Sequence, residues 1–349
     1  MSVTAREEFE TRQRQLLSPH ACHGSRGRVR PEPEDPIRTS FQRDRDRVLH
    51  CKSFRRLAHK TQVFLSPAGD HYRTRITHTL EVTQIARTIA RALLLNEDLT
   101  ETIALTHDLK HTPFGHTGEA VLHRLLPGGF HHVRQSLRVV DLLEQDGHGL
   151  NLTLEVREGI ERHSKGKGAI LADDAQHAAS TLEAQIVRVA DIIAYVNHDL
   201  DDAIRAEILC IDDVPRPILD TVGRRHSQRI AFLVNDVLQA TDLDHQRLIC
   251  ISPTGQAMLD ALRAFLYQRV YDNPTVHGDL QKAERVLEAL WCHFVDEVPD
   301  TFRELYWPDG VPASEPIQRA VADFIASMTD RYALRLHEEL LLPRRWPVF

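Results

Sequence analysis

The chain has 349 residues, of which 42% are hydrophobic and 27% charged, a composition typical of a globular protein with one large domain or a core plus an appendage. Its formal net charge of −7 at pH 7 argues against a general nucleic-acid coat or a basic membrane face, so an anionic substrate would need a local basic pocket. Five scattered cysteines without a CxxC pair argue against a disulfide framework or a thiolate zinc site. The polar N-terminus and the lack of any apolar run of membrane length predict a cytoplasmic protein.

Apolar residues recur at helical spacing through most of the chain, whereas the alternation typical of strands is scarce. Residues 18–36 are rich in Pro, Gly and charge and predict an irregular arm. A turn at 66–69 and loops at 146–151 and 164–175 interrupt the pattern. We expect an all-α fold with helices, in chain order, at 43–64, 77–95, 103–109, 118–126, 130–143, 181–209, 258–271, 281–295 and 316–341.

Histidine is concentrated in one part of the chain. Of the 21 histidines, six lie between His107 and His132. Imidazole binds metals and titrates near neutral pH, so this clustering indicates a functional segment. Solvated loop histidines are the alternative interpretation.

Four residues have the types and settings of ligands for a divalent cation. His78 lies on the apolar stripe of its helix, four residues before Val82, and the pair His107 and Asp108 ends an apolar run. Asp191 lies in the apolar sequence VRVADIIAYV, where an ionised carboxylate is costly without a partner. A divalent cation would satisfy all of these groups together.

Each residue, taken singly, has another interpretation. A buried histidine is more often a hydrogen-bonded core residue than a ligand, and a His-Asp pair occurs by chance, as at 198–199. Asp191 also lies three residues after Arg188, at a spacing suited to an ion pair within one helix.

Several longer motifs accompany these residues. They are FRRLAHKTQVF (54–64), DHYRTRITHTLEV (70–82), HDLKHTPFGH (107–116), GLNLT (149–153), ADIIAYVNHDLDD (190–202) and MTDRYA (328–333). Through these motifs the chain resembles the HD-domain superfamily, and within it the bacterial deoxyguanosinetriphosphate triphosphohydrolase-like proteins. The resemblance implies an HD-domain helical bundle with additional C-terminal helices. We expect an N-terminal arm at 1–45, an HD-type metal-binding catalytic core at 46–210, and a helical region at 211–349 that completes the same globule.

The resemblance also implies roles for individual residues. The expected metal ligands are His78, His107, Asp108 and Asp191. The expected catalytic residues are His111, His116, Glu119 and His132. Among these, the match of His116 implies general acid–base catalysis, with Glu119 three residues further on to orient its imidazole.

A second set of matches implies contacts to the substrate. These residues are Gln62, Arg75, Tyr195, Asp199, Arg263 and Tyr271. Tyr195 would stand against C2′ of a deoxyribose, Asp199 would accept the 3′-hydroxyl proton, and Arg75 would meet the phosphates. For each arginine, a solvated surface charge is the alternative, and for Arg263 the two interpretations have equal weight.

The activity implied is metal-dependent hydrolysis of deoxynucleoside triphosphates (dNTPs) to deoxynucleoside and inorganic triphosphate. Manganese is the first expectation for the cation, with magnesium, cobalt, iron, nickel or zinc as alternatives. The resemblance implies a homo-oligomer, either tetramer or hexamer, and no membrane association. It leaves open a second dNTP as an allosteric effector and single-stranded DNA as an effector.

Two positions depart from the family pattern. Lys110 stands where the family has glycine, and it adds bulk and a positive charge beside the expected cation. Val133 stands where the family usually has Asn or Glu. Two other functions therefore stay open: another HD-type nucleotide phosphohydrolase reaction, and a dNTP-binding regulator with a site impaired by Lys110.

Overall fold

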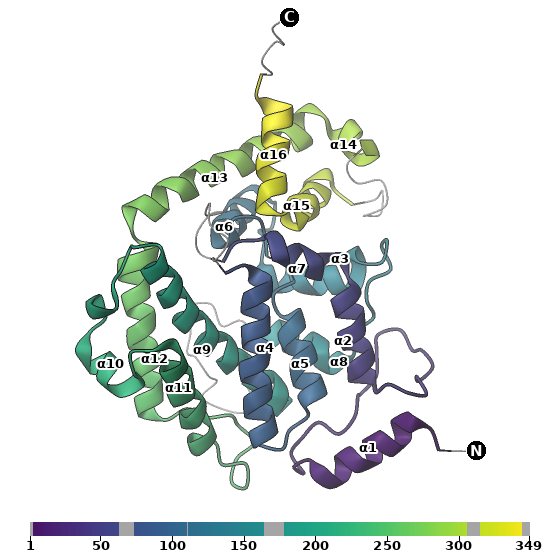
Figure 1. Cartoon of the computed structure of the whole chain (residues 1–349). Coiled ribbons are helices and arrows are strands. Elements are labelled where there is room, and N and C mark those ends of the chain that lie inside the picture. Colours follow the sequence, from purple (N-terminus) through teal and green to yellow (C-terminus); the bar gives the residue numbers. More distant parts are fainter. Residues whose placement is uncertain (1–2, 63–72, 110, 164–177, 306–314, 344–349) are drawn as a thin grey trace, which may run out of the picture. The chain divides into compact units, whose positions relative to one another are not determined.

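The computed structural model describes residues 3–62, 73–109, 111–163, 178–305 and 315–343 (Figure 1). Sixteen α-helices form within these ranges, which confirms the all-α fold class. Extended pairing in the same ranges is limited to two isolated bridges, which join Arg28 to Thr153 and Thr61 to Thr74.

The helices divide into two compact units built from interleaved segments of the chain. Unit 1 comprises Met1–Cys51, Ile76–Asp108 and Leu150–Asn273, and unit 2 comprises Lys52–Arg75, Leu109–Gly149 and Pro274–Phe349. The division at residues 45 and 210 expected from the sequence separates an arm, a catalytic core and a remainder by role, and it stays a prediction.

Unit 1 is built around one long helix, α9 (Leu182–Arg205), which packs against four other helices of the unit, α5, α8, α11 and α12. Most of α9 is buried, as expected for a helix that is apolar nearly all round. The helices of this unit are α1 (Ala5–Leu16), α2 (Ser40–His50), α4 (Arg75–Ala92), α5 (Glu97–Thr106), α8 (Leu154–Arg162), α9, α10 (Arg216–Val222), α11 (His226–Ala240) and α12 (Pro253–Leu266).

Unit 2 has its own apolar core, in which α13 packs against α6, α15 and α16. The rings of Phe294, Phe302 and Phe324 meet edge to face or tilted, with centroids 5.2–5.6 Å apart. The helices of this unit are α3 (Lys52–Arg56), α6 (Gly115–Leu125), α7 (His132–Arg138), α13 (Pro274–Cys292), α14 (Pro299–Leu305), α15 (Ile317–Ser327) and α16 (Asp330–Leu341).

Two helices expected from the sequence are broken, each by a capping interaction. The segment 43–64 is divided at Cys51 because the carboxylate of Glu144 accepts hydrogen bonds from the backbone of Lys52 (3.0 Å) and Ser53 (2.7 Å) and so starts a new helix, α3. The segment 316–341 is divided because Thr329 is extended and its hydroxyl caps the first turn of α16.

Five helices lie outside the ranges expected from the sequence, namely α1, α8, α10, α11 and α14. Helix α1 has a complete capping box, with Thr4 and Glu7 bonded reciprocally, but it buries none of its residues and therefore lacks an apolar stripe. Helix α8 has only nine residues, and the loop expected after it, at 164–175, lies outside the described residues. The irregular arm expected at 18–36 is confirmed.

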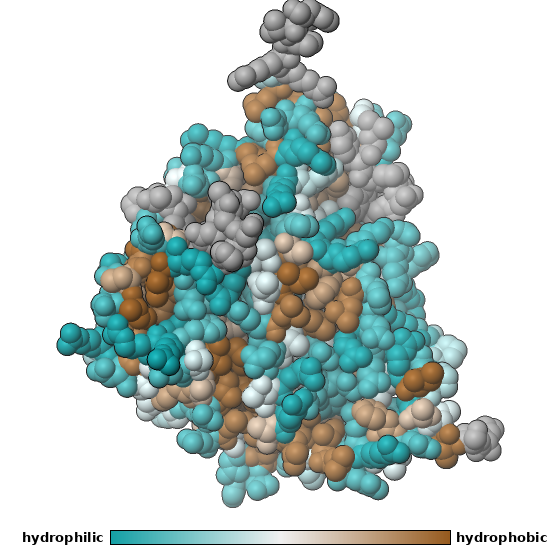
Figure 2. All heavy atoms as spheres, viewed as in Figure 1, coloured by the Kyte–Doolittle hydropathy of each residue, from teal (hydrophilic) through white to brown (hydrophobic). Residues whose placement is uncertain are grey.

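Most of the surface visible in Figure 2 is hydrophilic, with apolar areas scattered through it. In the part of the chain that the structure describes, none of the helices combines the length and the apolarity needed to cross a bilayer.

The close approach of α8 to α5 depends on a glycine. A Cβ atom at Gly159 would lie 2.7–2.8 Å from three side-chain carbons of Ile103, far inside normal contact. We expect Gly159→Ala to lower the free energy of unfolding by about 1–3 kcal/mol through overpacking. Gly278 in α13 has nothing within 4 Å of such an atom, so Gly278→Ala is the control and should raise stability by about 0.5–1 kcal/mol. Urea denaturation followed by circular dichroism measures both, and equal stability of Gly159→Ala and wild type would contradict the packing argument.

Candidate functional site

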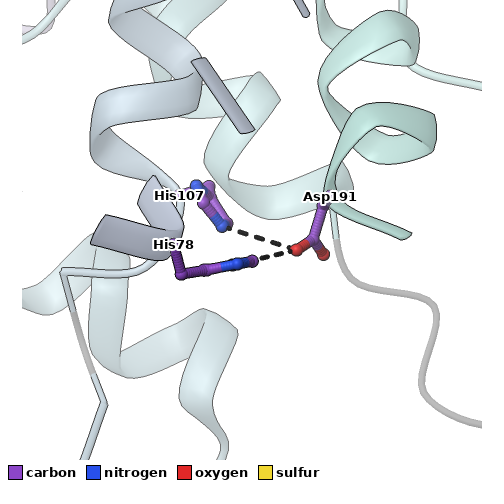
Figure 3. A group of neighbouring side chains, drawn as sticks. All are labelled: His78, His107 and Asp191. Carbon is purple, nitrogen blue, oxygen red and sulfur yellow. Dashed lines mark ion pairs between the residues drawn. The ribbon is translucent and has the colours of Figure 1, made fainter. Parts of the chain in front are cut away.

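Three side chains of unit 1 bring their ligand atoms together (Figure 3). His78 projects from α4, His107 follows the last residue of α5, and Asp191 projects from α9. Their ligand atoms all lie within 4.8 Å of one another. Nε2 of His78 is 3.2 Å and Nε2 of His107 is 3.7 Å from the same oxygen, Oδ1 of Asp191.

His107 presents an unpartnered nitrogen to this group. Its Nδ1 lies 2.6 Å from the carbonyl oxygen of Ala104 in the last turn of α5, so Nδ1 carries the hydrogen and donates it. In the neutral imidazole Nε2 is then a lone-pair acceptor. This Nε2 is buried and has no hydrogen-bond partner, which is costly for a polar atom and is the state of a histidine prepared to bind a cation.

The carboxylates beside the two imidazoles supply negative charge. Burial alone would raise the pKa of Asp191, but the imidazoles of His78 and His107 outweigh it and hold this pKa well below its ordinary value. Asp108 is buried, with Oδ1 3.8 Å from Nε2 of His107, and its charge also acts on Asp191. This set of nitrogen and oxygen donors fits a divalent cation, which His78, His107 and Asp191 would hold with Asp108 beside them.

A hydrogen-bonded chain continues from His78 away from this group. Nδ1 of His78 lies 2.7 Å from Nε2 of His198, and Nδ1 of His198 lies 2.9 Å from Oδ1 of Asp199. Oδ2 of Asp199 accepts a hydrogen bond from the hydroxyl of Tyr271. Tyr271 ends a π-helical turn, η4 (Tyr267–Tyr271), that continues α12. The structure therefore joins two predicted substrate residues, Asp199 and Tyr271, to a predicted metal ligand.

Tyr195 and Arg263, also expected to contact substrate, lie together in unit 1. Burial raises the pKa of Tyr195, against the effect of the neighbouring Arg263, so the phenol keeps its proton at neutral pH. The side chain of Arg263 is 15% exposed, and its Nε is buried without a hydrogen-bond partner. Arg263 is therefore not a solvated surface charge; it lies 3.5 Å from Oδ1 of Asp260, and its contact with a substrate stays a prediction.

Unit 2 holds the predicted acid–base group. Nδ1 of His116 lies 3.9 Å from Oε2 of Glu119 on the next turn of α6. Glu119 Oε1 accepts hydrogen bonds from the backbone N–H (3.0 Å) and from Nδ1 (2.6 Å) of His132. Burial would raise the pKa of Glu119, but hydrogen bonds from His116 and His132 lower it well below its ordinary value. The side chain of His116 is 89% exposed, so Glu119 is an ionised partner to a histidine open to ligands.

The backbone around His116 turns sharply and allows other predicted residues to approach. Phe114 and Gly115 both have positive φ (62° and 60°), and a Cβ atom at Gly115 would lie 3.0 Å from Nη2 of Arg75 and 3.7 Å from the carbonyl oxygen of Gln62. The ring of His111 lies 6.3 Å from that of His116. Gln62, Arg75, His111 and His116 therefore surround one turn.

A carboxylate from the C-terminal part of the chain fixes this turn. Oδ1 of Asp330 accepts a hydrogen bond from the backbone N–H of Phe114 (3.0 Å), and Oδ2 accepts from the backbone N–H of Thr61 (3.0 Å). Asp330 belongs to the motif at 328–333, for which the sequence indicated no role.

Of the two residues that depart from the family pattern, Lys110 and Val133, the structure describes only Val133. Lys110 lies outside the described residues. Val133 is partly buried in the first turn of α7, beside His132.

Two histidines near the metal ligands were missed in the sequence. His198 was dismissed as part of a chance His-Asp pair, although its spacing of seven residues from Asp191 places both on one helix face. His163 is buried at the end of α8, with its ring 5.4 Å from that of His107.

The chain matches two known protein domains and several known proteins in sequence. Residues 75–196 match the HD domain, and residues 249–339 match a phosphohydrolase-associated domain. A deoxyguanosinetriphosphate triphosphohydrolase-like protein of Desulfatibacillum aliphaticivorans is 52% identical over 348 residues, covering 98% of this chain and 99% of that protein. Proteins of the same name from Caldanaerobacter subterraneus (51%, covering 99% and 98%) and Clostridium tetani (42%, covering 98% and 97%) also match. The chain belongs to the deoxyguanosinetriphosphate triphosphohydrolase-like family.

This membership confirms the expected family, and with the HD domain it supports a phosphohydrolase activity. HD domains bind divalent metal ions, and the cluster of His78, His107 and Asp191 lies within the matched range. Arg263 and Tyr271 lie within the phosphohydrolase-associated domain of the family.

Removing the unpartnered nitrogen of His107 should remove metal binding. We expect His107→Phe, which keeps a buried ring of similar shape, to weaken Mn²⁺ binding by more than about 100-fold, since even residues behind metal ligands contribute 10–100-fold. The control is His245→Ala, which removes an exposed histidine of unit 1 that pairs with Asp242. Isothermal titration with Mn²⁺ measures both, and unchanged affinity in His107→Phe would show that the cation binds elsewhere.

Proposed function

We propose that this chain hydrolyses dNTPs to deoxynucleoside and inorganic triphosphate, using a divalent cation, manganese in the first instance, held by His78, His107, Asp108 and Asp191. The observation that carries the proposal is the convergence of two Nε2 atoms on one carboxylate oxygen, 3.2 and 3.7 Å away. The substrate class is supported by the names of the relatives, which refer to triphosphate hydrolysis of a deoxynucleotide.

A bound divalent cation supplies Lewis acidity at the phosphate and lowers the pKa of the attacking water. The protein's own contribution starts with the position of the phosphates. Arg75 and Arg263 are nearly buried, at 3% residue and 15% side-chain exposure, so their charges act on phosphate oxygens with little screening by water.

The leaving group is the O5′ atom of the deoxynucleoside, which needs a proton as its bond to the α-phosphorus breaks. We assign this proton to His116, with Glu119 as the ionised group that orients the imidazole and stabilises its protonated form. We place His111 and His132 at the phosphates.

We assign the sugar to Tyr195, Asp199 and Gln62. We place the ring of Tyr195 against C2′, where a ribonucleotide would bring a hydroxyl into contact with it. Asp199 accepts from Tyr271 and His198, and a carboxylate has about four acceptor positions, so it can also accept from the 3′-hydroxyl. Gln62 makes a further contact to this hydroxyl. A homo-oligomer, and allosteric activation by a second dNTP or by single-stranded DNA, remain predictions from the family resemblance.

The proposal is tested by incubating the purified protein with each dNTP and Mn²⁺ and analysing the products. We expect equimolar deoxynucleoside and inorganic triphosphate, with loss of turnover in EDTA. His116→Asn should lower kcat by about 10²–10⁴-fold while Mn²⁺ affinity is kept, because general acid catalysis contributes on that scale. His245→Ala should match wild type.

Other products identify the other functions. Inorganic phosphate released from nucleoside monophosphates would replace the proposal with another HD-type reaction. Tight binding of dNTPs without turnover would indicate a regulator, and turnover regained in Lys110→Gly would trace the loss to Lys110.

The sugar assignment makes a separate prediction. We expect Tyr195→Ala to reduce the preference for dGTP over GTP, measured as the ratio of kcat/KM values, by about 10-fold or more, since one excluded group is worth about 1–3 kcal/mol. Tyr195→Phe keeps the ring and removes only the hydroxyl, so it should keep the preference. Equal preference in wild type and Tyr195→Ala would mean that another residue stands against C2′.

A further inference from the structure

Four side chains of unit 1 form one buried hydrogen-bonded chain that ends at the candidate metal centre. His198 is fully buried, and Asp199 and His78 are only 3% and 2% exposed. The chain runs from the hydroxyl of Tyr271 to Asp199, from Asp199 to His198 (2.9 Å), and from His198 to His78 (2.7 Å). Hydrogen bonds between groups that are largely screened from solvent strengthen one another, so the four side chains act as one network.

The hydrogen bonds of the chain have one consistent direction when a cation is bound at the candidate centre. An ionised carboxylate only accepts, so Nδ1 of His198 carries the hydrogen that it donates to Asp199. Nε2 of neutral His198 is then an acceptor, and it takes the hydrogen on Nδ1 of His78. Nε2 of His78 lies 3.2 Å from Asp191 Oδ1, and a cation bound between them would take its lone pair in place of the hydrogen bond to Asp191. The hydroxyl of Tyr271 donates at the far end, since burial raises the pKa of this phenol well above its ordinary value.

We propose that His198 is a positioning residue that fixes the ring orientation and the tautomer of His78, and that through Asp199 it links the sugar-binding residues to the metal centre. The inference rests on the proposed metal site. A histidine ligand whose second nitrogen is held by a partner presents the right lone pair without rearrangement, and the loss of such a partner typically weakens metal binding 10–100-fold.

The two histidines of the metal centre differ in how they are held. Nδ1 of His107 donates to a backbone carbonyl, that of Ala104, which no side-chain substitution removes. Nδ1 of His78 faces a side chain, that of His198. The geometry of His78 is therefore the one that a single substitution outside the ligand set can disturb.

Two amide substitutions separate the two contacts of His198. In His198→Gln the amide oxygen reaches the position of Nε2 and can still accept from His78. In His198→Asn the shorter side chain reaches the position of Nδ1, so it can still donate to Asp199 but leaves Nδ1 of His78 without its acceptor. Both variants bury an amide of similar polarity, so a merely structural role would affect them alike.

The readout is Mn²⁺ affinity without nucleotide, together with the visible spectrum of the Co²⁺ form, which reports ligand geometry. We expect His198→Asn to bind Mn²⁺ about 10–100-fold more weakly than wild type with an altered Co²⁺ spectrum, and His198→Gln to stay within about threefold. Asn197→Ala is the control for damage to α9. Asn197 is fully buried beside His198 and bonds Ile193 and Arg229, so this variant should lose stability and keep the affinity.

The measured affinities distinguish a positioning role of His198 from a merely structural one. Equal affinities in wild type, His198→Asn and His198→Gln, or equal losses in both variants, would overturn the positioning role and leave the metal site standing. A wild-type protein that binds no divalent ion would overturn the proposed site and this inference with it. If His198→Asn fails to fold, ¹⁵N-histidine NMR of the wild type loaded with diamagnetic Zn²⁺ decides, because the inference requires a proton on Nδ1 of His78 that is held in a hydrogen bond to His198.

Discussion

The cost of burying polar groups on the inner faces of three helices is the constraint on which the candidate site depends. His78 and His107 are almost fully buried, and both point Nε2 at one oxygen of Asp191. Two lone pairs and a carboxylate repel one another in a low-dielectric interior unless a cation or a proton lies among them. Buried apolar side chains along the rest of α4, α5 and α9 stabilise the unit. Their burial offsets the free-energy cost of placing His78, His107 and Asp191 together.

Further polar residues of unit 1 are connected to the candidate metal ligands by hydrogen bonds. Asp199 and Tyr271 come from α9 and from the π-helical turn after α12, yet both connect through His198 to His78. Tyr195 of α9 and Arg263 of α12 form a side-chain hydrogen bond. Asp199 and Tyr271, assigned to the sugar, and His78, assigned to the cation, are thus parts of one polar network in an otherwise apolar unit.

In unit 2 the backbone around an exposed histidine, His116, is held in a defined conformation. Two successive residues with positive φ, Phe114 and Gly115, start α6, and such a turn is strained for Phe114. Asp330 compensates by accepting the backbone N–H of Phe114. At Gly118 a Cβ atom would lie 2.1 Å from the carbonyl oxygen of Pro113, so only glycine allows the turn to close against the helix. His116 is therefore exposed at its side chain and fixed at its backbone.

The sequence by itself determined the fold class and most helices, and it singled out His78, His107 and Asp191, which the structure brings together, because helical periodicity and a polar residue on an apolar stripe are local properties. It also determined the family through its long motifs. Tertiary structure alone decided which of these residues meet. Glu144 divides a helix that periodicity would continue, since its carboxylate comes from 91 residues away to cap Ser53. The burial of Arg263 and the bond from His198 to His78, 120 residues apart, have no local signature. Such contacts depend on how helices pack, and the free energy of that packing is a sum over the whole unit that no short stretch of sequence contains.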